Sequence, residues 1–257
     1  MVAGYPDYHT SVEIGKALLD AGVSFLEIQF PFSDPTADGP VIQTACTEAI
    51  AHGFNVTEGF ALVEELCRSR KNPAAAPVML MSYASLVYAR PMETFVREAL
   101  NAGVAGLIVP DLPIDSDEGL YAIGTKLGID VVPVVVPSMS DARLDLLRRI
   151  QPRYVYAALR SGITGSYTDI GEENFAFLRK VAAFGPMVLA GFGVRSPQQV
   201  ALLAPHVHAV VVGSAFVGEI ASAGSDSGAA AAAVGRLAST LIDAGSSNDN
   251  TLLGRTT

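Results

Sequence analysis

The sequence has few of the residues on which several classes of protein depend. Only two of its 257 residues are cysteine, Cys46 and Cys67, and both lie in segments with helical periodicity. We therefore expect two buried thiols in a reducing compartment and no disulfide framework. The four histidines show no metal-ligand spacing with one another or with the cysteines. We expect surface or hydrogen-bonded core positions for them.

Basic residues are also scarce. The chain has 17 Lys and Arg residues against 26 Asp and Glu residues, a formal net charge of −9 at pH 7, and no Lys/Arg cluster. This balance argues against nucleic acid or an anionic membrane as a partner. A bound phosphate group would have to be held by backbone N–H groups rather than by a basic patch.

Long apolar runs are missing too, although 50% of the residues are hydrophobic. The longest runs, such as Val132–Val136, are far too short to span a bilayer. The start, Met1–Gly4, lacks the charged and apolar regions of a signal peptide. These features predict a soluble cytoplasmic protein with a large core.

What the sequence does contain is a regular alternation of short Val-, Ile- and Leu-rich runs with longer helical segments. Apolar runs of this kind are typical of parallel strands that helices cover on both faces. Eight such units favour an α/β protein of the (β/α)8 TIM barrel class over an open sheet, and no G-x-G-x-x-G follows the first run. The expected strands are Met1–Gly4, Ser24–Ile28, Val78–Met81, Gly106–Val109, Asp130–Val134, Tyr154–Ala157, Met187–Ala190 and Ala209–Val212.

The expected helices separate these strands, and some carry their own start signals. Ser140 and Ser196 are placed to cap helices, and Pro197 suits a first helical position. The expected helices are Thr10–Ala21, Val41–His52, Thr57–Arg70, Pro91–Ala102, Asp117–Leu127, Asp141–Ile150, Glu172–Ala183, Ser196–Ala204 and Ala229–Ala244.

The two ends of the chain depart from this repeating pattern. The chain opens inside its first expected strand, with nothing before Met1 to cover the floor of a barrel. Residues 245–257 are polar and without periodicity, which predicts a disordered tail. A single barrel domain is therefore expected over residues 1–244.

The most informative stretch is Ser24–Gln43, where a buried strand runs into a loop rich in Pro, Ser and Asp. Side chains alternate along a strand, so Phe25, Glu27 and Gln29 share one face and the apolar residues between them share the other. A lone carboxylate in a buried strand is costly unless it is hydrogen-bonded or protonated. We therefore expect Glu27 to face the barrel lumen and to take part in catalysis.

A second carboxylate, Asp38, ends the loop just before Gly39-Pro40. In an apolar wall, Glu27 would have a raised pKa and could exchange protons near neutral pH. Asp38, in a polar loop, would stay ionised and stabilise positive charge. The local pattern equally allows Asp38 to be a helix cap.

Three glycine-bearing loops follow neighbouring strands in the second half of the chain. Their backbone N–H groups, with a short helix over Ala215–Ile220, can form a cradle for an anion. Phosphate sites recur at this end of (β/α)8 barrels. Together with the two carboxylates, the loops predict acid–base chemistry on a phosphorylated small molecule. The loop residues concerned are Gly165, Gly193, Gly213 and Ser214.

These residues carry a resemblance to a known family. The run Pro31–Pro40 (PFSDPTADGP), preceded by Leu26-Glu27, resembles the signature of tryptophan synthase alpha subunits. The resemblance continues in order over essentially residues 1–220. It implies a lyase that cleaves indole-3-glycerol phosphate into indole and glyceraldehyde 3-phosphate.

The resemblance also implies roles for individual residues. Glu27 would be the acid–base residue, and Asp38 would hold the indole N–H as positive charge develops on the ring. Tyr156 and Thr164 match positions that support the Asp38 carboxylate. Tyr83 and Phe192 match positions that contact the indole. Gly165, Gly193, Gly213 and Ser214 match the phosphate cradle.

By the same resemblance, the chain would need no metal or organic cofactor, because the protonated ring accepts the electrons itself. Pyridoxal phosphate would belong to a partner beta subunit, which receives the indole in an alpha2beta2-type complex. Two alternatives stay open: a weakly catalytic regulatory subunit that activates a beta subunit, and a free-standing indole-producing lyase.

Three departures from the family pattern stand out. Gln29 lies where the family usually has a small Gly, one pleat from Glu27. Ser85 replaces the Asn of a Tyr-x-Asn motif in a loop expected to face the beta subunit. The family also has an N-terminal helix and the beginning of the first strand, which are absent here.

Overall fold

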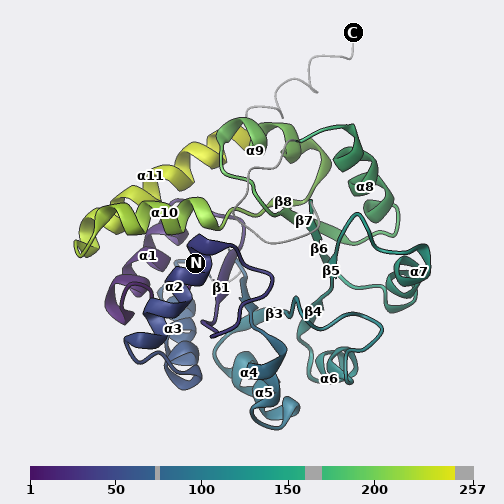
Figure 1. Ribbon diagram of the computed structural model, residues 1–257, viewed down its shortest axis with the longest axis horizontal. Helices are drawn as coiled ribbons and strands as arrows, with labels where there is room; N and C mark the ends of the chain where they lie inside the picture. Colours follow the sequence, from purple (N-terminus) through teal and green to yellow (C-terminus); the bar gives the residue numbers. More distant parts are fainter. Residues whose placement is uncertain (73–75, 160–169, 247–257) are drawn as a thin grey trace.

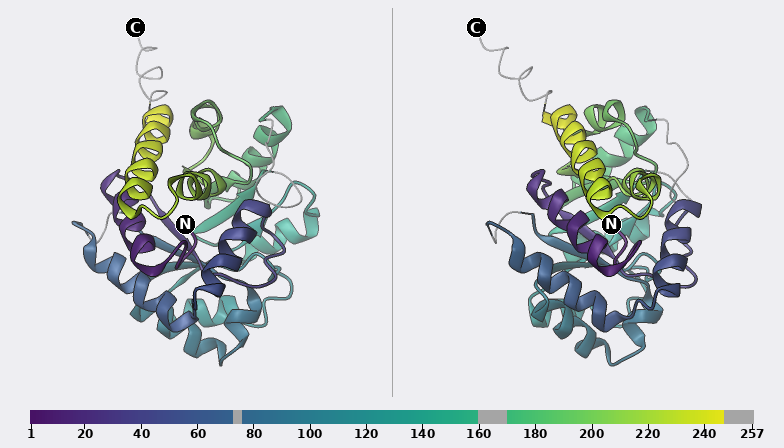
Figure 2. Two further views of the ribbon diagram at one scale, coloured as in Figure 1. Left: turned by 60° about the vertical axis from the view of Figure 1, so that its left-hand side comes forward. Right: turned by 90° about the vertical axis from the view of Figure 1, so that its left-hand side faces the viewer.

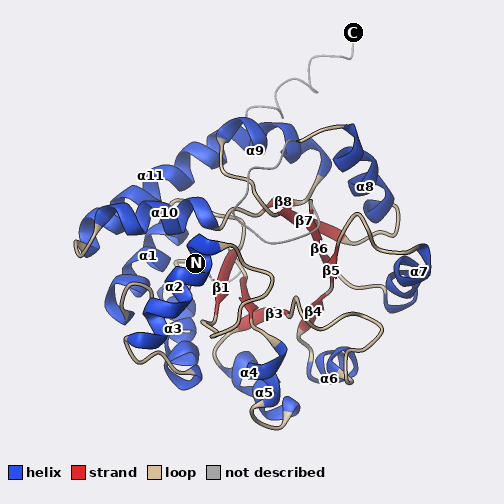
Figure 3. Cartoon of the chain, in the orientation of Figure 1, coloured by secondary structure: helices blue, strands red, loops and turns tan. Residues whose placement is uncertain are grey.

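Short parallel strands form a ring at the centre of the molecule, and helices surround it (Figure 1; Figure 3). The computed structural model describes residues 1–72, 76–159 and 170–246. Strands pair in the orders β1–β2–β3–β4 and β5–β6–β7–β8, and every pair is parallel. The strands are β1 (Leu26–Gln29), β2 (Val78–Met81), β3 (Val104–Ile108), β4 (Asp130–Val132), β5 (Val134–Val135), β6 (Tyr154–Ala158), β7 (Met187–Gly191) and β8 (Ala209–Val210).

The outer layer consists of helices that cover the strands. The last helix packs against three others, α1, α9 and α10, on one side of the ring (Figure 2). No helix within the described part of the chain is both long and apolar enough to cross a bilayer. The helices are α1 (Tyr8–Asp20), α2 (Pro40–Ala51), α3 (Val56–Ser69), α4 (Ala84–Tyr88), α5 (Met92–Asn101), α6 (Leu120–Leu127), α7 (Asp141–Ile150), α8 (Glu172–Ala182), α9 (Pro197–Leu203), α10 (Ser214–Ala223) and α11 (Ser227–Ser246), with a 3-10 turn at Ala204–His206.

This arrangement confirms the (β/α)8 class, with two local differences among the strands. The first expected strand, Met1–Gly4, forms only an isolated bridge between Val2 and Gln29. The expected strand Asp130–Val134 is split at Pro133, which has no N–H to donate to a neighbouring strand. The carbonyl of Pro133 still accepts a hydrogen bond from the Tyr156 N–H at 2.9 Å, so the two sheets stay joined.

Two differences concern the helices. The short helix α4 was not expected, and α11 is longer at both ends than the predicted Ala229–Ala244. It continues through Gly245 and Ser246, the first two residues of the expected tail. The remainder of that tail, residues 247–257, lies outside the described part of the chain.

Side chains alternate along each strand, so the strands separate a core between strands and helices from a core inside the barrel. In β1, Leu26 and Ile28 are buried in the layer between strands and helices, whereas Glu27 and Gln29 point to the inside of the barrel. A second cluster fills the inside of the barrel below the carboxyl ends of the strands. Its buried members are Met79, Met81, Tyr83, Ile108, Val132, Tyr154, Tyr156 and Leu189.

Phe30, directly after β1, provides a test of the packing that holds this strand in place. Its ring is fully buried and packs edge-on against Phe54 and Phe60, at centroid distances of 5.7 and 5.2 Å. We expect Phe30→Ala to lower the free energy of unfolding by about 3–5 kcal/mol. Each kcal/mol should lower Tm by about 2–4 °C in a chain of this size.

Urea and thermal unfolding followed by circular dichroism measure this loss. Leu202→Ala is the control, because Leu202 is 51% exposed and its truncation should change stability by no more than about 0.5 kcal/mol. Equal losses in the two variants would contradict the packing role of Phe30.

Candidate active site

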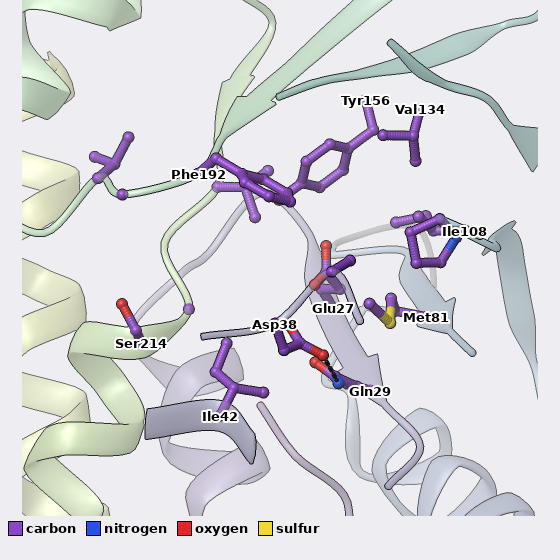
Figure 4. Close-up of a pocket in the computed structure, with 16 residues that line it drawn as sticks. Glu27, Gln29, Asp38, Ile42, Met81, Ile108, Val134, Tyr156, Phe192 and Ser214 are labelled. Carbon is purple, nitrogen blue, oxygen red and sulfur yellow. Dashed lines mark hydrogen bonds between the residues drawn. The ribbon is translucent and has the colours of Figure 1, made fainter. Parts of the chain in front are cut away.

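A cavity opens at the carboxyl ends of the strands, where the two carboxylates singled out in the sequence meet (Figure 4). Glu27 reaches it from β1, and Asp38 reaches it from the loop between β1 and α2. Both side chains project into the same space in Figure 4. The remaining lining residues are mostly apolar: Ala37, Ile42, Met81, Ile108, Pro110, Val134, Tyr156, Phe192, Val194 and Val211, with Gln29, Gly193, Gly213 and Ser214.

Glu27 is half-buried at the bottom of this cavity. Burial raises the pKa of its carboxyl above the ordinary value, and the nearby Asp38 carboxylate raises it further, while the Met1 amino group partly offsets both. A raised pKa lets a carboxyl hold a proton at a pH where an exposed glutamate would have lost it. Glu27 is thereby suited to donate a proton and to take one back.

Asp38 is held by hydrogen bonds from a residue in β1 and from the residue that precedes α4. Its side chain is 1% exposed, and its Oδ2 accepts hydrogen bonds from Gln29 Nε2 at 2.6 Å and from the Tyr83 hydroxyl at 2.8 Å. The capping residue of α2 is Gly39, which has no side chain with which to cap the helix. Asp38 is therefore placed as a buried acceptor inside the cavity rather than as the cap of that helix.

The two tyrosines occupy different positions around this carboxylate. Tyr83, fully buried and stacked on Phe32 at 5.3 Å, donates to Asp38 and accepts a hydrogen bond from the Ala37 N–H at 3.1 Å. Burial, then the charge of Asp38, raises the pKa of Tyr83, which keeps its hydroxyl protonated as a donor. Tyr156 instead lies in the cavity wall. The family resemblance implied that Tyr156 supports Asp38 and that Tyr83 contacts the ring; the structure shows that Tyr83 itself donates a hydrogen bond to Asp38.

The wall near Tyr156 requires a glycine. A Cβ on Gly191 would lie 2.7 Å from the Tyr156 hydroxyl oxygen and 3.1 Å from the Val211 carbonyl oxygen. Only glycine allows β7 to approach that closely. Phe192 follows, edge-on to Tyr156 with centroids 6.2 Å apart, and closes this side of the cavity.

Two glycine loops reach the rim of the same cavity. Phe192 and Gly193 both have positive φ, 80° and 79°, and turn the chain sharply after β7. Gly213, the N-cap of α10, lines the cavity and, as a glycine, has no side chain with which to cap the first N–H groups of the helix. Two of the three expected loops are thus brought together, whereas Thr164 and Gly165 lie outside the described residues.

Sequence reasoning missed most of the apolar wall. Met81 and Ile108 are the last residues of β2 and β3, and Val134 begins β5. The sequence signal that could have identified these lining residues is their position at the carboxyl end of an expected strand. Across residues 1–72, 76–159 and 170–246, no three His, Cys, Asp or Glu side chains are grouped to hold a metal ion.

Comparisons with known proteins agree over nearly the whole chain. The sequence model of one family, described as tryptophan synthase alpha chain, matches residues 1–244. A protein of that name from Helicobacter hepaticus is 40% identical over 220 residues, which are 84% of this chain and 82% of the relative.

Solved structures give the same result. The tryptophan synthase subunit alpha from Legionella pneumophila is 28% identical with a TM-score of 0.84, over 97% of this chain and 91% of that one. A chain of the tryptophan synthase complex from Pyrococcus furiosus is 30% identical with a TM-score of 0.82, over 94% of this chain and 95% of that one.

The raised pKa of Glu27 predicts how the free energy of unfolding depends on pH. Between the unfolded pKa of about 4.3 and the higher folded pKa, the unfolded state loses the Glu27 proton while the folded state keeps it, so folding becomes less favourable as pH rises. Gln does not titrate. We expect Glu27→Gln to gain stability relative to the wild type as pH is raised from about 4 towards neutral.

Urea unfolding of both proteins between pH 4 and 8 measures this difference. Glu173→Gln, at an exposed position at the start of α8, is the control for the loss of one negative charge. Stability curves that run parallel for the wild type and Glu27→Gln would contradict a raised pKa at Glu27.

Proposed function

Because the chain belongs to the tryptophan synthase alpha chain family, we propose that it cleaves indole-3-glycerol phosphate into indole and glyceraldehyde 3-phosphate in tryptophan biosynthesis. The observation that carries this proposal is the pair formed by Glu27 and Asp38. One carboxyl with a raised pKa and one carboxylate held by neutral donors face the same apolar cavity. This is the combination that cleavage of a carbon–carbon bond next to an indole ring needs.

The first step protonates the ring. Glu27 gives its proton to C3 of the indole, and the ring nitrogen takes the positive charge of the resulting indolenine. Asp38 accepts the N–H hydrogen bond of that nitrogen and stabilises the charge as it develops. The apolar wall strengthens this interaction, because charges attract more strongly where little water is present.

The second step breaks the bond between C3 and the glycerol side chain. Glu27, now ionised, removes the proton from the hydroxyl on the carbon attached to the ring. That carbon becomes the aldehyde, and the electrons of the broken bond return to the ring and restore a neutral indole. Glu27 ends the cycle protonated. The ring is its own electron acceptor, so this route needs neither metal nor organic cofactor.

The phosphate end of the substrate fits the rim that the glycine loops form. Gly193, Gly213 and Ser214 line the cavity there, at the N-terminus of α10. Helix N-termini bind phosphate through their N–H groups and their partial positive charge. We propose the same role for Gly165, and a supporting role near Asp38 for Thr164. Tyr156 and Phe192 would contact the ring, and Tyr83 would position Asp38.

Removing the acid–base group tests the mechanism directly. We expect Glu27→Gln to lower indole release by about 10³-fold or more, because one group serves both proton transfers and each such transfer contributes about 10²–10⁴-fold. The far-UV circular dichroism should be unchanged. Indole is measured by chromatography under substrate saturation, with Glu173→Gln as the matched control. Substantial turnover by Glu27→Gln would remove Glu27 from the mechanism.

We further propose that the chain works with a pyridoxal-phosphate-dependent beta subunit in an alpha2beta2-type complex in the cytoplasm. The Pyrococcus furiosus relative was solved as a tryptophan synthase complex. The two free cysteines, Cys46 and Cys67, suit a reducing compartment. Ser85, the departure in the loop expected to face a beta subunit, is exposed at the start of α4. The family match over residues 1–244 supports a single barrel domain of that extent.

Mixing the chain with a beta subunit tests the partnership. We expect a complex at micromolar concentrations and faster indole release than from the isolated chain. Glu27→Gln should bind equally well, because Glu27 lies inside the barrel. Indole release without any complex would favour a free-standing lyase. Activation of the beta subunit without indole release from the isolated or mixed chain would favour a regulatory subunit.

A further inference from the structure

Gln29 is the polar residue of the cavity that the proposed reaction leaves without a role. It lies two residues after Glu27 on the same face of β1, and its side chain is 5% exposed. Its Nε2 atom donates to Asp38 Oδ2 at 2.6 Å and lies 3.7 Å from Cys46 Sγ in α2. Gln29, a strand neighbour of Glu27, thus donates a hydrogen bond directly to the Asp38 carboxylate, as Figure 4 shows.

We propose that Gln29 is a positioning residue, which orients the Asp38 carboxylate towards the ring nitrogen. The inference deepens the proposed function and rests on it. Asp38 belongs to a loop, and a loop side chain has no fixed direction of its own. Two donors from neighbouring strands, Gln29 in β1 and Tyr83 after β2, meet on the same oxygen and set that direction.

The chemistry of the donor explains why an amide serves here. Hydrogen bonds to a carboxylate favour its charged form over its protonated form. A Lys or Arg at this position would do so too, but its charge would cancel the negative charge that the ring nitrogen needs. The carboxamide of Gln29 is neutral. It stabilises the carboxylate and leaves its full charge available for the reaction.

The backbone around Asp38 is held independently of Gln29. The Gln43 side chain donates to the Asp38 carbonyl at 2.8 Å, and Tyr83 accepts from the Ala37 N–H. Loss of the Gln29 donor should therefore weaken the orientation of the carboxylate without unfolding the loop. This separation makes the positioning role testable apart from the fold.

The competing explanation is packing, in which Gln29 only fills space between β1 and Cys46. Gln29→Met distinguishes the two, because methionine keeps the length and shape of glutamine and removes the donor. Gln29→Leu is a second variant without a donor in case the first folds poorly. Ile28→Val is the matched control: it perturbs the packing of the same strand on its other, fully buried face, away from Asp38.

We expect Gln29→Met and Gln29→Leu to lower kcat for indole release about 10- to 100-fold, the loss typical of a misplaced reacting group, with a smaller change in KM. Ile28→Val should leave kcat unchanged.

Coupling to Asp38 gives an independent readout. In an Asp38→Asn background, Gln29→Met should lower kcat no further, because its only effect acts through the carboxylate. Full additivity of the two substitutions, or an unchanged kcat in both Gln29→Met and Gln29→Leu, would overturn the positioning role and leave the proposed function intact. A wild-type chain that releases no indole with or without a beta subunit would overturn the proposed function, and this inference with it.

Discussion

The alternation of side chains along β1 is the constraint on which the site depends. Four residues place two apolar side chains outwards against the helices and two polar side chains inwards. Burial of Leu26 and Ile28 stabilises the strand and fixes its register, since a shift of one residue would exchange the two faces. The burial of these apolar neighbours thus offsets the free-energy cost of burying Glu27. The same buried position raises the pKa of Glu27.

Asp38 depends on the barrel in another way. It lies on a loop, and loops by themselves hold side chains loosely. Here the strand ends supply rigid donors, and Phe32 stacks on Tyr83 to keep one of those donors in place. The site therefore combines a strand residue positioned by packing with a loop residue positioned by hydrogen bonds.

The features that the sequence predicted correctly are those that depend on the chemistry of neighbouring residues. The capping Ser196, the expected strand Val78–Met81 and the inward face of β1 depend on neighbouring residues only, and each is observed. Helix α4 was missed because the Asp111 side chain, from beyond β3, accepts a hydrogen bond from the first N–H of that helix at 2.9 Å. The hydrogen bonds that Tyr83 and Gln29 donate to Asp38 likewise depend on how separate segments of the barrel face one another.

The packing of the first helix on the last has a consequence for how the molecule assembles. α1 lies near the beginning of the chain and α11 near its end, and they are in contact along one side of the ring (Figure 2). During synthesis, the amino-terminal strands and helices emerge from the ribosome long before α11 does. Their outer surface beside α1 stays exposed until α11 has been synthesised. Contacts between such distant segments slow folding, so closure of the ring is expected to be a late event.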